Sequence, residues 1–169
     1  MIEMLRGAAL VVATVAMGLL AGLFYAFAVS VMPGLRRTDG RTFVDAMQQI
    51  NVAITNGWFF ISFFGAPVLT IIAAALHLHG GGRTVLPWTV AALVLYGVAF
   101  IITIRVNIPL NDALAAAGPP DRTTDLTQVR ERFEATWVRW NIARAVASTA
   151  ALGCLIWALV LYGRTTAAT

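Results

Sequence analysis

Four long stretches of the chain are mostly apolar and carry no charged residue. They run through residues 7–33, 46–76, 84–103 and 145–163. A helix needs about 20 apolar residues to cross about 30 Å of hydrocarbon. The pattern therefore predicts four membrane spans, near residues 7–33, 56–78, 85–106 and 142–163. Because these spans use nearly the whole chain, we expect a single four-span domain over residues 1–169.

Two of the helices are predicted to extend beyond the membrane. Apolar residues recur at helical spacing from Thr42 onward, which predicts a second helix that begins there and continues into its span. The fourth helix is expected to begin after Thr124 or Asp125, either of which would serve as its N-cap. From there to Tyr162 it would measure about 55 Å, which exceeds the thickness of a bilayer. The predicted fold is therefore an all-α integral membrane four-helix bundle, with helices 2 and 4 extending on one side.

The charged residues are concentrated at one end of this predicted bundle. Of the 20 charged residues (12 basic and 8 acidic), Glu3, Arg6, Arg83 and Arg164 lie at the end that holds both termini. The other sixteen lie within residues 36–45 and 105–144, and we call this end the polar cap. The cap also has more arginines near span ends, so the positive-inside rule predicts a multi-pass protein of the cell membrane with a cytoplasmic cap and both termini outside.

The start of the chain has an alternative interpretation as a signal peptide. Arg6 precedes the first apolar run, and residues 26–28 resemble a cleavage site. The run before that site has about 19 residues, whereas the apolar region of a signal peptide has about 7–15. We therefore expect a retained span. Gly18 and Gly22 within it favour close helix packing, either inside the bundle or in a homodimer.

Several functional classes are disfavoured by the composition. Cys154 is the only cysteine, so the chain can form neither an internal disulfide nor a CxxC redox pair. No basic run exceeds two residues, which argues against a nucleic-acid partner. His77 and His79 would point in nearly opposite directions on a helix, so we interpret them as a surface pair and predict no metal and no haem. No acidic residue lies within the four uncharged runs, which argues against proton-coupled transport.

Polar side chains form stripes on three of the predicted helices. Two asparagines of the third helix, Asn107 and Asn111, are four residues apart, with Asp112 beside them and Pro109 between them. The pattern predicts that the three stripes face one another and line a pocket at the membrane boundary. On the fourth helix the stripe contains Arg130, Glu134, Trp137, Asn141, Arg144 and Ser148, with Trp140 one position away, and on the second it contains Gln48, Asn51, Thr55 and Trp58.

An ordinary structural role is the alternative for each of these residues. Polar residues at span ends commonly satisfy helix termini, and tryptophan commonly anchors a helix at the interface. Such anchors would scatter around each helix, however, whereas these residues share faces. Arg144 lies about one turn inside an apolar run, so we expect it to point inward. Its expected partners are Asn107, Asn111, a carboxylate (Asp45 or Asp112) or the carbonyl group freed by Pro109.

The same segments resemble the anthrone oxygenase family of small four-span membrane proteins. The most specific matching segments are residues 107–111 (Asn-Ile-Pro-Leu-Asn) and 140–144 (Trp-Asn-Ile-Ala-Arg). Residues 31–35, 49–51, 56–59 and 132–134 also match. The resemblance implies a four-helix membrane fold and the oxidation of an anthrone to an anthraquinone with O2 as co-substrate and no further cofactor.

The resemblance also implies roles for individual residues. Trp137 and Trp140 would stack against the aromatic substrate, and either Asp112 or Glu134 would act as the base. The side chains that would stabilise an enolate-like oxygen are Asn107, Asn111, Asn141 and Arg144. The predicted partners are the lipid bilayer and a lipophilic small molecule. The alternative function is a non-catalytic membrane protein that binds a lipid or quinone-like ligand or scaffolds a partner.

Overall fold

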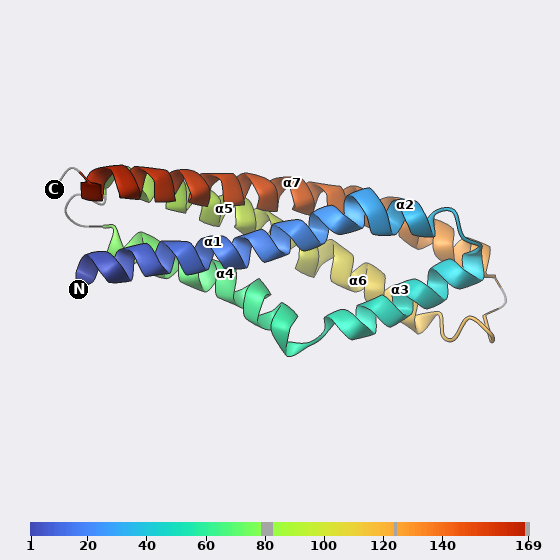
Figure 1. The fold of residues 1–169 in the computed structure, drawn as a ribbon. Coiled ribbons are helices and arrows are strands. Elements are labelled where there is room, and N and C mark those ends of the chain that lie inside the picture. Colours follow the sequence, from blue (N-terminus) through green and yellow to red (C-terminus); the bar gives the residue numbers. More distant parts are fainter. Residues whose placement is uncertain (79–82, 124, 168–169) are drawn as a thin grey trace.

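A computed structural model describes residues 1–78, 83–123 and 125–167, and these residues form an elongated helical bundle (Figure 1). Its main helices are α1 (Ile2–Ala26), α4 (Gly57–Leu76), α5 (Leu86–Ile102) and α7 (Leu126–Ala167). α1 and α5 each pack against both α4 and α7, so the four helices form a closed ring. The described residues contain no strand. The predicted all-α four-helix bundle is confirmed.

Four helical segments are long and apolar enough to cross a membrane: Ile2–Leu35, Gly57–Leu76, Leu86–Ala116 and Leu126–Ala167. Their outward faces carry exposed aliphatic side chains such as Leu19, Ile61 and Val94. Small and medium residues fill the centre, where Ala13, Ala92 and Ala151 allow the helices to approach closely. A bundle with an apolar outer surface is stable in lipid rather than in water, so this is a membrane protein.

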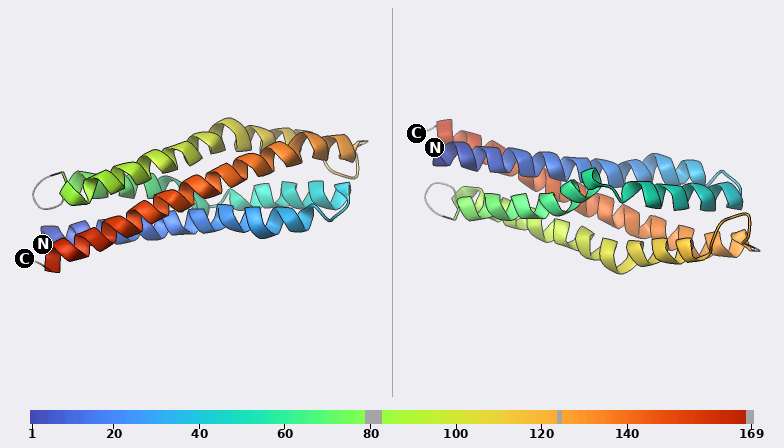
Figure 2. Two further views of the ribbon diagram at one scale, coloured as in Figure 1. Left: turned by 90° about the horizontal axis from the view of Figure 1, so that it is seen from above. Right: turned by 90° about the horizontal axis from the view of Figure 1, so that it is seen from below.

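Both termini lie at one end of the bundle, and the polar cap lies at the other (Figures 1 and 2). The cap consists of α2 (Met32–Leu35), α3 (Gly40–Ile54), α6 (Ile108–Ala116) and the first turns of α7. Its own apolar cluster contains Met32, Phe43, Met47 and Phe133. The predicted extension of helices 2 and 4 on one side is therefore confirmed.

The predicted second helix is in fact two helices, α3 and α4, and the expectation of one continuous helix is wrong. Thr55 leaves the helical conformation at φ −78° and ψ 62°, and Asn56 is extended. The side chain of Asn56 accepts a hydrogen bond from the backbone N–H of Phe59 at 3.1 Å. Asn is a preferred N-cap residue, and here it starts a new helix inside an apolar pattern. The junction bows away from α1 and α7 (Figure 1).

α7, in contrast, is one uninterrupted helix of 42 residues, about 63 Å long. Its N-cap is Asp125, whose carboxylate accepts a hydrogen bond from the N–H of Gln128 at 2.9 Å. The expected start near Asp125 is confirmed, and Thr124, the other candidate, lies outside the described residues. Because this helix extends from the cap to the opposite end, it holds cap residues and deep residues in one fixed register.

The other two long helices each contain a π-helical turn just before a proline. η1 (Phe27–Val31) precedes Pro33, and η3 (Thr103–Asn107) precedes Pro109. Proline lacks an N–H and its ring collides with the carbonyl four residues earlier in an α-helix. The wider π turn accommodates this by pairing Met32 N–H with Phe27 O and Ile108 N–H with Thr103 O. The expected distortion at Pro109 takes this form.

At the end of the bundle that holds the termini, the structure tests what was expected of His77 and of Gly18. His77 is fully buried, its Nδ1 lies 2.7 Å from the carbonyl oxygen of Ala73, and its ring packs against Tyr162. The interpretation of His77 as a surface residue is therefore wrong, because its ring is buried against Tyr162 of α7. His79 lies outside the described residues. Gly18 faces Leu152 of α7, so it packs within the bundle.

Candidate functional site

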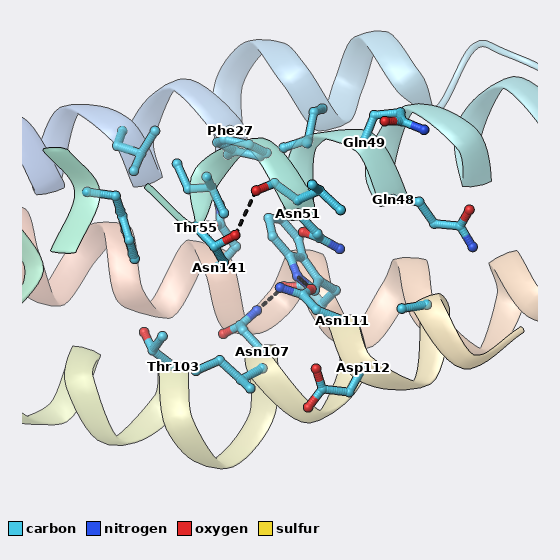
Figure 3. Close-up of a pocket in the computed structure, with 18 of the residues that line it drawn as sticks. Phe27, Gln48, Gln49, Asn51, Thr55, Thr103, Asn107, Asn111, Asp112 and Asn141 are labelled. Carbon is cyan, nitrogen blue, oxygen red and sulfur yellow. Dashed lines mark hydrogen bonds between the residues drawn. The ribbon is translucent and has the colours of Figure 1, made fainter. Parts of the chain in front are cut away.

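A cavity of about 980 Å³ lies where the α3–α4 junction, both π turns and α7 meet. Figure 3 shows amide side chains from α3 on one side of it and from η3 and α6 on the other. The distorted backbone at these three places holds the helices apart. Nine of the twelve predicted site residues line the cavity: Gln48, Asn51, Thr55, Asn107, Asn111, Asp112, Trp137, Asn141 and Arg144.

Aromatic side chains form a large part of the apolar wall. The indole of Trp137 and the ring of Phe27 have centroids 5.6 Å apart. The opposite side is built by phenylalanines of α4, in which Phe59 and Phe63 stack at 5.3 Å. The aromatic residues lining the cavity are Phe24, Phe27, Phe59, Phe60, Phe63, Phe64 and Trp137. Flat aromatic rings fit against such walls by offset stacking or edge-to-face contact.

Arg144 provides a buried positive charge at this aromatic wall. Its side chain points inward, and the residue is only 6% exposed. Nη2 donates to Oδ1 of Asn141 at 2.9 Å, and Nη1 donates to the hydroxyl of Thr103 at 3.3 Å. The guanidinium carbon lies 4.4 Å from the ring centroid of Phe24 and 5.5 Å from that of Trp137. Cation–π contact of this kind partly replaces the lost hydration of the charge.

The inward direction of Arg144 is as predicted, but its predicted partners are wrong. Among the described residues its guanidinium hydrogen-bonds to Thr103 and Asn141, and to neither asparagine of the third helix nor a carboxylate. Its Nε–H is buried and has no hydrogen-bond partner within the described part of the chain. A buried charged donor without a partner is costly, so a ligand placed within reach of this atom would lower the energy of the site.

Asn141 and Asn111 hold two of the functional side chains in place. Asn141 donates from Nδ2 to the backbone oxygen of Phe24 at 3.0 Å while accepting from Arg144. Asn111 accepts from the indole N–H of Trp137 at 2.8 Å. These contacts tie α1 and α6 to α7. They fix the orientation of both the guanidinium and the indole.

Two further amide side chains line the cavity, those of Asn107 and Asn51, and each has one polar atom without a hydrogen-bond partner among the described residues. Asn107 is almost fully buried and donates weakly to the backbone oxygen of Trp137 at 3.5 Å. Its Oδ1 has no partner among the described residues, and neither has the Nδ2 of Asn51. Together with Arg144 Nε, the cavity therefore offers two unused donors and one unused acceptor. Buried polar groups are normally satisfied, so this set indicates a ligand.

Three predicted site residues lie outside the cavity. Glu134 instead forms an ion pair with Arg130 at 2.6 Å, and Arg130 also donates to the backbone oxygens of Thr38 and Arg36. Trp140 turns away from the stripe and lies beneath the guanidinium of Arg139. Trp58 is 84% exposed at the start of α4. The placement of these three in the pocket is wrong, since Glu134 belongs to the cap and Trp58 loses its place in the stripe at the helix break.

The phenylalanines of the cavity wall and Thr103 were not predicted from the sequence. The available signal was the pair of doublets Phe59-Phe60 and Phe63-Phe64, which recur one helical turn apart. In an apolar span such residues are indistinguishable from lipid-facing ones. Thr103 continues α5 in α-helical register, with its N–H paired to Ala99 O, and no pattern in the sequence marks it as a partner of Arg144.

Within the described residues, no group of three or more His, Cys, Asp or Glu side chains is arranged to hold a metal ion. The acidic residues that line the cavity are Asp45, Asp112 and Asp121. Asp121 pairs with Arg41. Asp45 and Asp112 lie at the cap side of the cavity, with exposed side chains.

The family model for anthrone oxygenase matches residues 58–154, more than half of the chain. This protein belongs to the anthrone oxygenase family. The match runs from the first turn of α4 into α7, and so includes η3, α6, Trp137, Asn141 and Arg144. The resemblance seen in the sequence is confirmed for this family. No curated protein and no solved structure matches the chain.

Proposed function

We propose that this membrane protein is an oxygenase that oxidises a flat, lipophilic aromatic of the anthrone type with O2. The observation that carries the proposal is the cavity of this family member, whose aromatic walls adjoin three buried polar atoms that have no partner among the described residues. A tricyclic aromatic ketone offers large flat faces to the walls. Its carbonyl would accept from Arg144 Nε or Asn51 Nδ2, and a phenolic hydroxyl would donate to Asn107 Oδ1.

The chemistry begins with removal of a proton from the methylene group of the substrate. The electron pair left behind is delocalised into the carbonyl, which becomes an enolate oxygen. Asp112 is the proposed base, because it lines the cavity whereas Glu134 is paired with Arg130. Arg144 would stabilise the enolate oxygen by charge and hydrogen bonding in a site that excludes water.

O2 then accepts electrons from the enolate carbon, and a C–O bond forms to give a hydroperoxide once a proton is added. Loss of the second methylene proton and cleavage of the O–O bond release water and leave a new carbonyl group. The balance is one CH2 group and one O2 consumed for one C=O group and one H2O formed. The protein is proposed to need no further cofactor, since an electron-rich carbanion reduces O2 directly.

The proposed location is the cell membrane, with the polar cap in the cytoplasm and the termini outside. Six arginines of the cap lie near span ends (Arg36, Arg37, Arg41, Arg122, Arg130 and Arg132), against three at the other end (Arg6, Arg83 and Arg164). This asymmetry supports the proposed orientation.

The test is an oxygen-uptake assay on the full chain in lipid nanodiscs with 1,8-dihydroxyanthrone as probe. We expect consumption of O2 and formation of the anthraquinone in a one-to-one ratio, above the rate in empty nanodiscs. With ¹⁸O2, one labelled oxygen should enter the new carbonyl and one should enter water. Asn107→Leu should lower the rate, whereas Gln128→Leu, at an exposed position of α7 outside the cavity, should not.

Binding of the probe without turnover would contradict the oxygenase proposal and support the alternative, a non-catalytic protein for a lipid or quinone-like ligand. A rate no higher than that of empty nanodiscs, together with no binding, would contradict both.

A further inference from the structure

We propose that the cavity opens sideways into the bilayer, between α4 and the η3–α6 segment, and that its ligand enters from the lipid. For the class of ligand this inference rests on the proposed function. The opening itself is inferred from the contacts between α3 and α4 on one side and α5, η3 and α6 on the other. We call the line along which these two sides face each other the seam. Contacts close the seam at two levels and leave it open between them.

On the side away from the cap, aromatic contacts close this seam. The hydroxyl of Tyr96 on α5 donates to the backbone oxygen of Phe63 on α4 at 2.8 Å. The rings of Phe63 and Phe100 stack with centroids 4.9 Å apart and an interplanar angle of 18°. These contacts form the floor of the cavity and separate it from the remainder of the bundle.

On the cap side, polar contacts close the same seam. The side chain of Gln48 on α3 donates from Nε2 to the backbone oxygens of Leu114 at 2.9 Å and Gly118 at 3.0 Å. Arg41 forms an ion pair with Asp121 in the turn that follows α6. α3 is therefore fastened to the end of α6 at the cap side of the cavity.

Between these two levels the seam is not bridged. Across the described residues, no hydrogen bond, ion pair or ring contact joins residues 49–62 to residues 101–113. Apolar side chains border this interval, and each is at once part of the cavity wall and 43% or more exposed. They are Val52 and Phe60 on one side, and Ile104 and Ile108 on the other.

The position of this interval favours a hydrocarbon neighbour. Phe60 lies on α4, and Ile104 and Ile108 lie in the third span, both long and apolar enough to cross the membrane. An opening framed by exposed apolar side chains is unfavourable in water, but lipid tails cover it without such a cost. Trp58 and Arg105 are exposed close by in sequence, as residues near a membrane–water interface often are.

This geometry restricts the ligand to molecules that dissolve in the bilayer and are thin enough to pass between two helices. A planar aromatic would enter with its polar edge first, toward Arg144 and Asn107 on the inner walls. It would not need to cross the polar contacts of Gln48 and Arg41. Charged or strongly hydrated compounds would be excluded, because they do not partition into hydrocarbon.

The first test closes each route with a reversible cross-link in a Cys154→Ala background. Phe60→Cys with Ile108→Cys spans the lateral opening, and Gln49→Cys with Ala115→Cys spans the cap side of the cavity. Each pair is joined with a cleavable bis-methanethiosulfonate, and the association rate of anthraquinone, a probe that cannot turn over, is measured in liposomes. We expect the lateral cross-link to slow association by about tenfold or more, reversed by reduction, and the cap cross-link to change it by less than about twofold.

The second test needs neither a ligand nor a double variant. A nitroxide label at Ile54→Cys, which lies in the cavity wall, is compared with labels at Arg122→Cys, exposed in the cap outside the cavity wall, and Ile142→Cys on the outer face of α7. We expect the label at residue 54 to be reached by O2 dissolved in the lipid and not by a water-soluble nickel complex, as at residue 142. Collision with the nickel complex, as at residue 122, would overturn the proposal.

The proposal would also be overturned if the cap cross-link, and not the lateral one, slowed the association of anthraquinone. If anthraquinone fails to bind the uncross-linked protein, the proposed function fails, while the spin-label result still decides the lateral opening.

Discussion

Asn141 and Arg144 form a pair on one face of α7, in which Oδ1 of Asn141 accepts from Nη2 of Arg144 at 2.9 Å. Asn141 is itself fixed by its hydrogen bond to the backbone oxygen of Phe24 on α1. The guanidinium therefore keeps one orientation although no carboxylate pairs with it. One nitrogen, Nε, is left without a partner among the described residues.

Arg144→Lys should impair binding and turnover more than retention of the charge suggests. Lysine lacks the planar, forked guanidinium group of arginine. It therefore cannot hydrogen-bond to both Asn141 and Thr103 while presenting a further N–H to a ligand. We expect the affinity for 1,8-dihydroxyanthrone to fall by about tenfold to a hundredfold, the range expected when charged hydrogen bonds are lost. Anaerobic titration in nanodiscs measures this affinity.

Arg139→Lys is the matched control, because Arg139 lies on the same helix, is exposed and stacks on Trp140 outside the cavity. It should bind the probe as the unsubstituted protein does. Unchanged binding by Arg144→Lys would show that the buried arginine has only a structural role.

Asp112→Asn and Glu134→Gln should separate catalysis from stability. If Asp112 is the base, Asp112→Asn should lower the turnover number by about 100-fold or more while leaving probe affinity nearly unchanged. Glu134→Gln breaks the ion pair with Arg130 in the cap, so it should lower Tm and leave turnover intact. Oxygen uptake and thermal unfolding, measured on both variants, test the assignment. A normal rate in Asp112→Asn would exclude it as the base.

The spans and the cap could be predicted from the sequence because both depend on composition along the chain. Four uncharged runs fix four crossings, and the position of the charges fixes which end forms a folded cap. The inward direction of Arg144 followed for the same reason, since a charge inside an apolar run must find polar or aromatic neighbours.

Details that depend on backbone register could not be predicted in this way. A helix that continues past Asn56 would put Trp58 on the stripe of Gln48 and Asn51, but the break at Thr55 removes it. The π turn of η3 shifts Asn107 and Asn111 relative to α5, and Thr103, which precedes the shift, is the residue of this segment that meets Arg144. A shift of one residue rotates a side chain by about 100° around the helix axis and so changes its partners. Hydrophobic periodicity in the sequence does not show whether such a shift occurs.

Asp39 should make the stability of the cap depend on pH. It is the N-cap of α3, and hydrogen bonds from the backbone N–H and then the hydroxyl of Thr42 hold its pKa below the ordinary value of 3.8. The folded state therefore favours the carboxylate, and this contribution is present above that value and is lost as the pH falls through the lowered pKa.

Thermal unfolding in detergent at about pH 6 and about pH 2.5 tests this dependence. Asp39→Ala should lower Tm at the higher pH, and the difference from the unsubstituted protein should shrink at the lower pH. Asp39→Asn keeps a good N-cap without a charge, so its own Tm should lose less between the two conditions. An equal loss in all three proteins would contradict a role of this cap in acid sensitivity.

Residues 83 and 122 should be accessible from opposite sides of the membrane. Arg83 lies before α5 at the end with the termini, and Arg122 lies in the turn before α7 in the cap. In a Cys154→Ala background, a membrane-impermeant maleimide added to intact cells should label Arg83→Cys and leave Arg122→Cys unlabelled until the cells are opened. The reverse pattern would invert the proposed orientation, and labelling of both from outside would contradict the four-crossing topology.

Pro109→Ala should stabilise the protein and weaken its site at the same time. Proline inside a helix is about 3 kcal/mol less favourable than alanine, and an alanine at this position restores the N–H that an α-helical turn requires. The η3 turn can then relax to α-helix, which rotates Asn107 and the residues after it relative to Thr103 and Arg144. We expect a higher Tm together with weaker probe binding, by about tenfold, as for the loss of one buried hydrogen-bond partner.

Pro67→Ala is the matched control, because Pro67 lies inside α4, where the helix remains α-helical and the residue does not line the large cavity. It should not weaken probe binding. Pro109→Ala with a higher Tm and full affinity would show that the π turn is a consequence of the proline alone and does not position the site. Loss of affinity in both variants would point instead to a general change in helix packing.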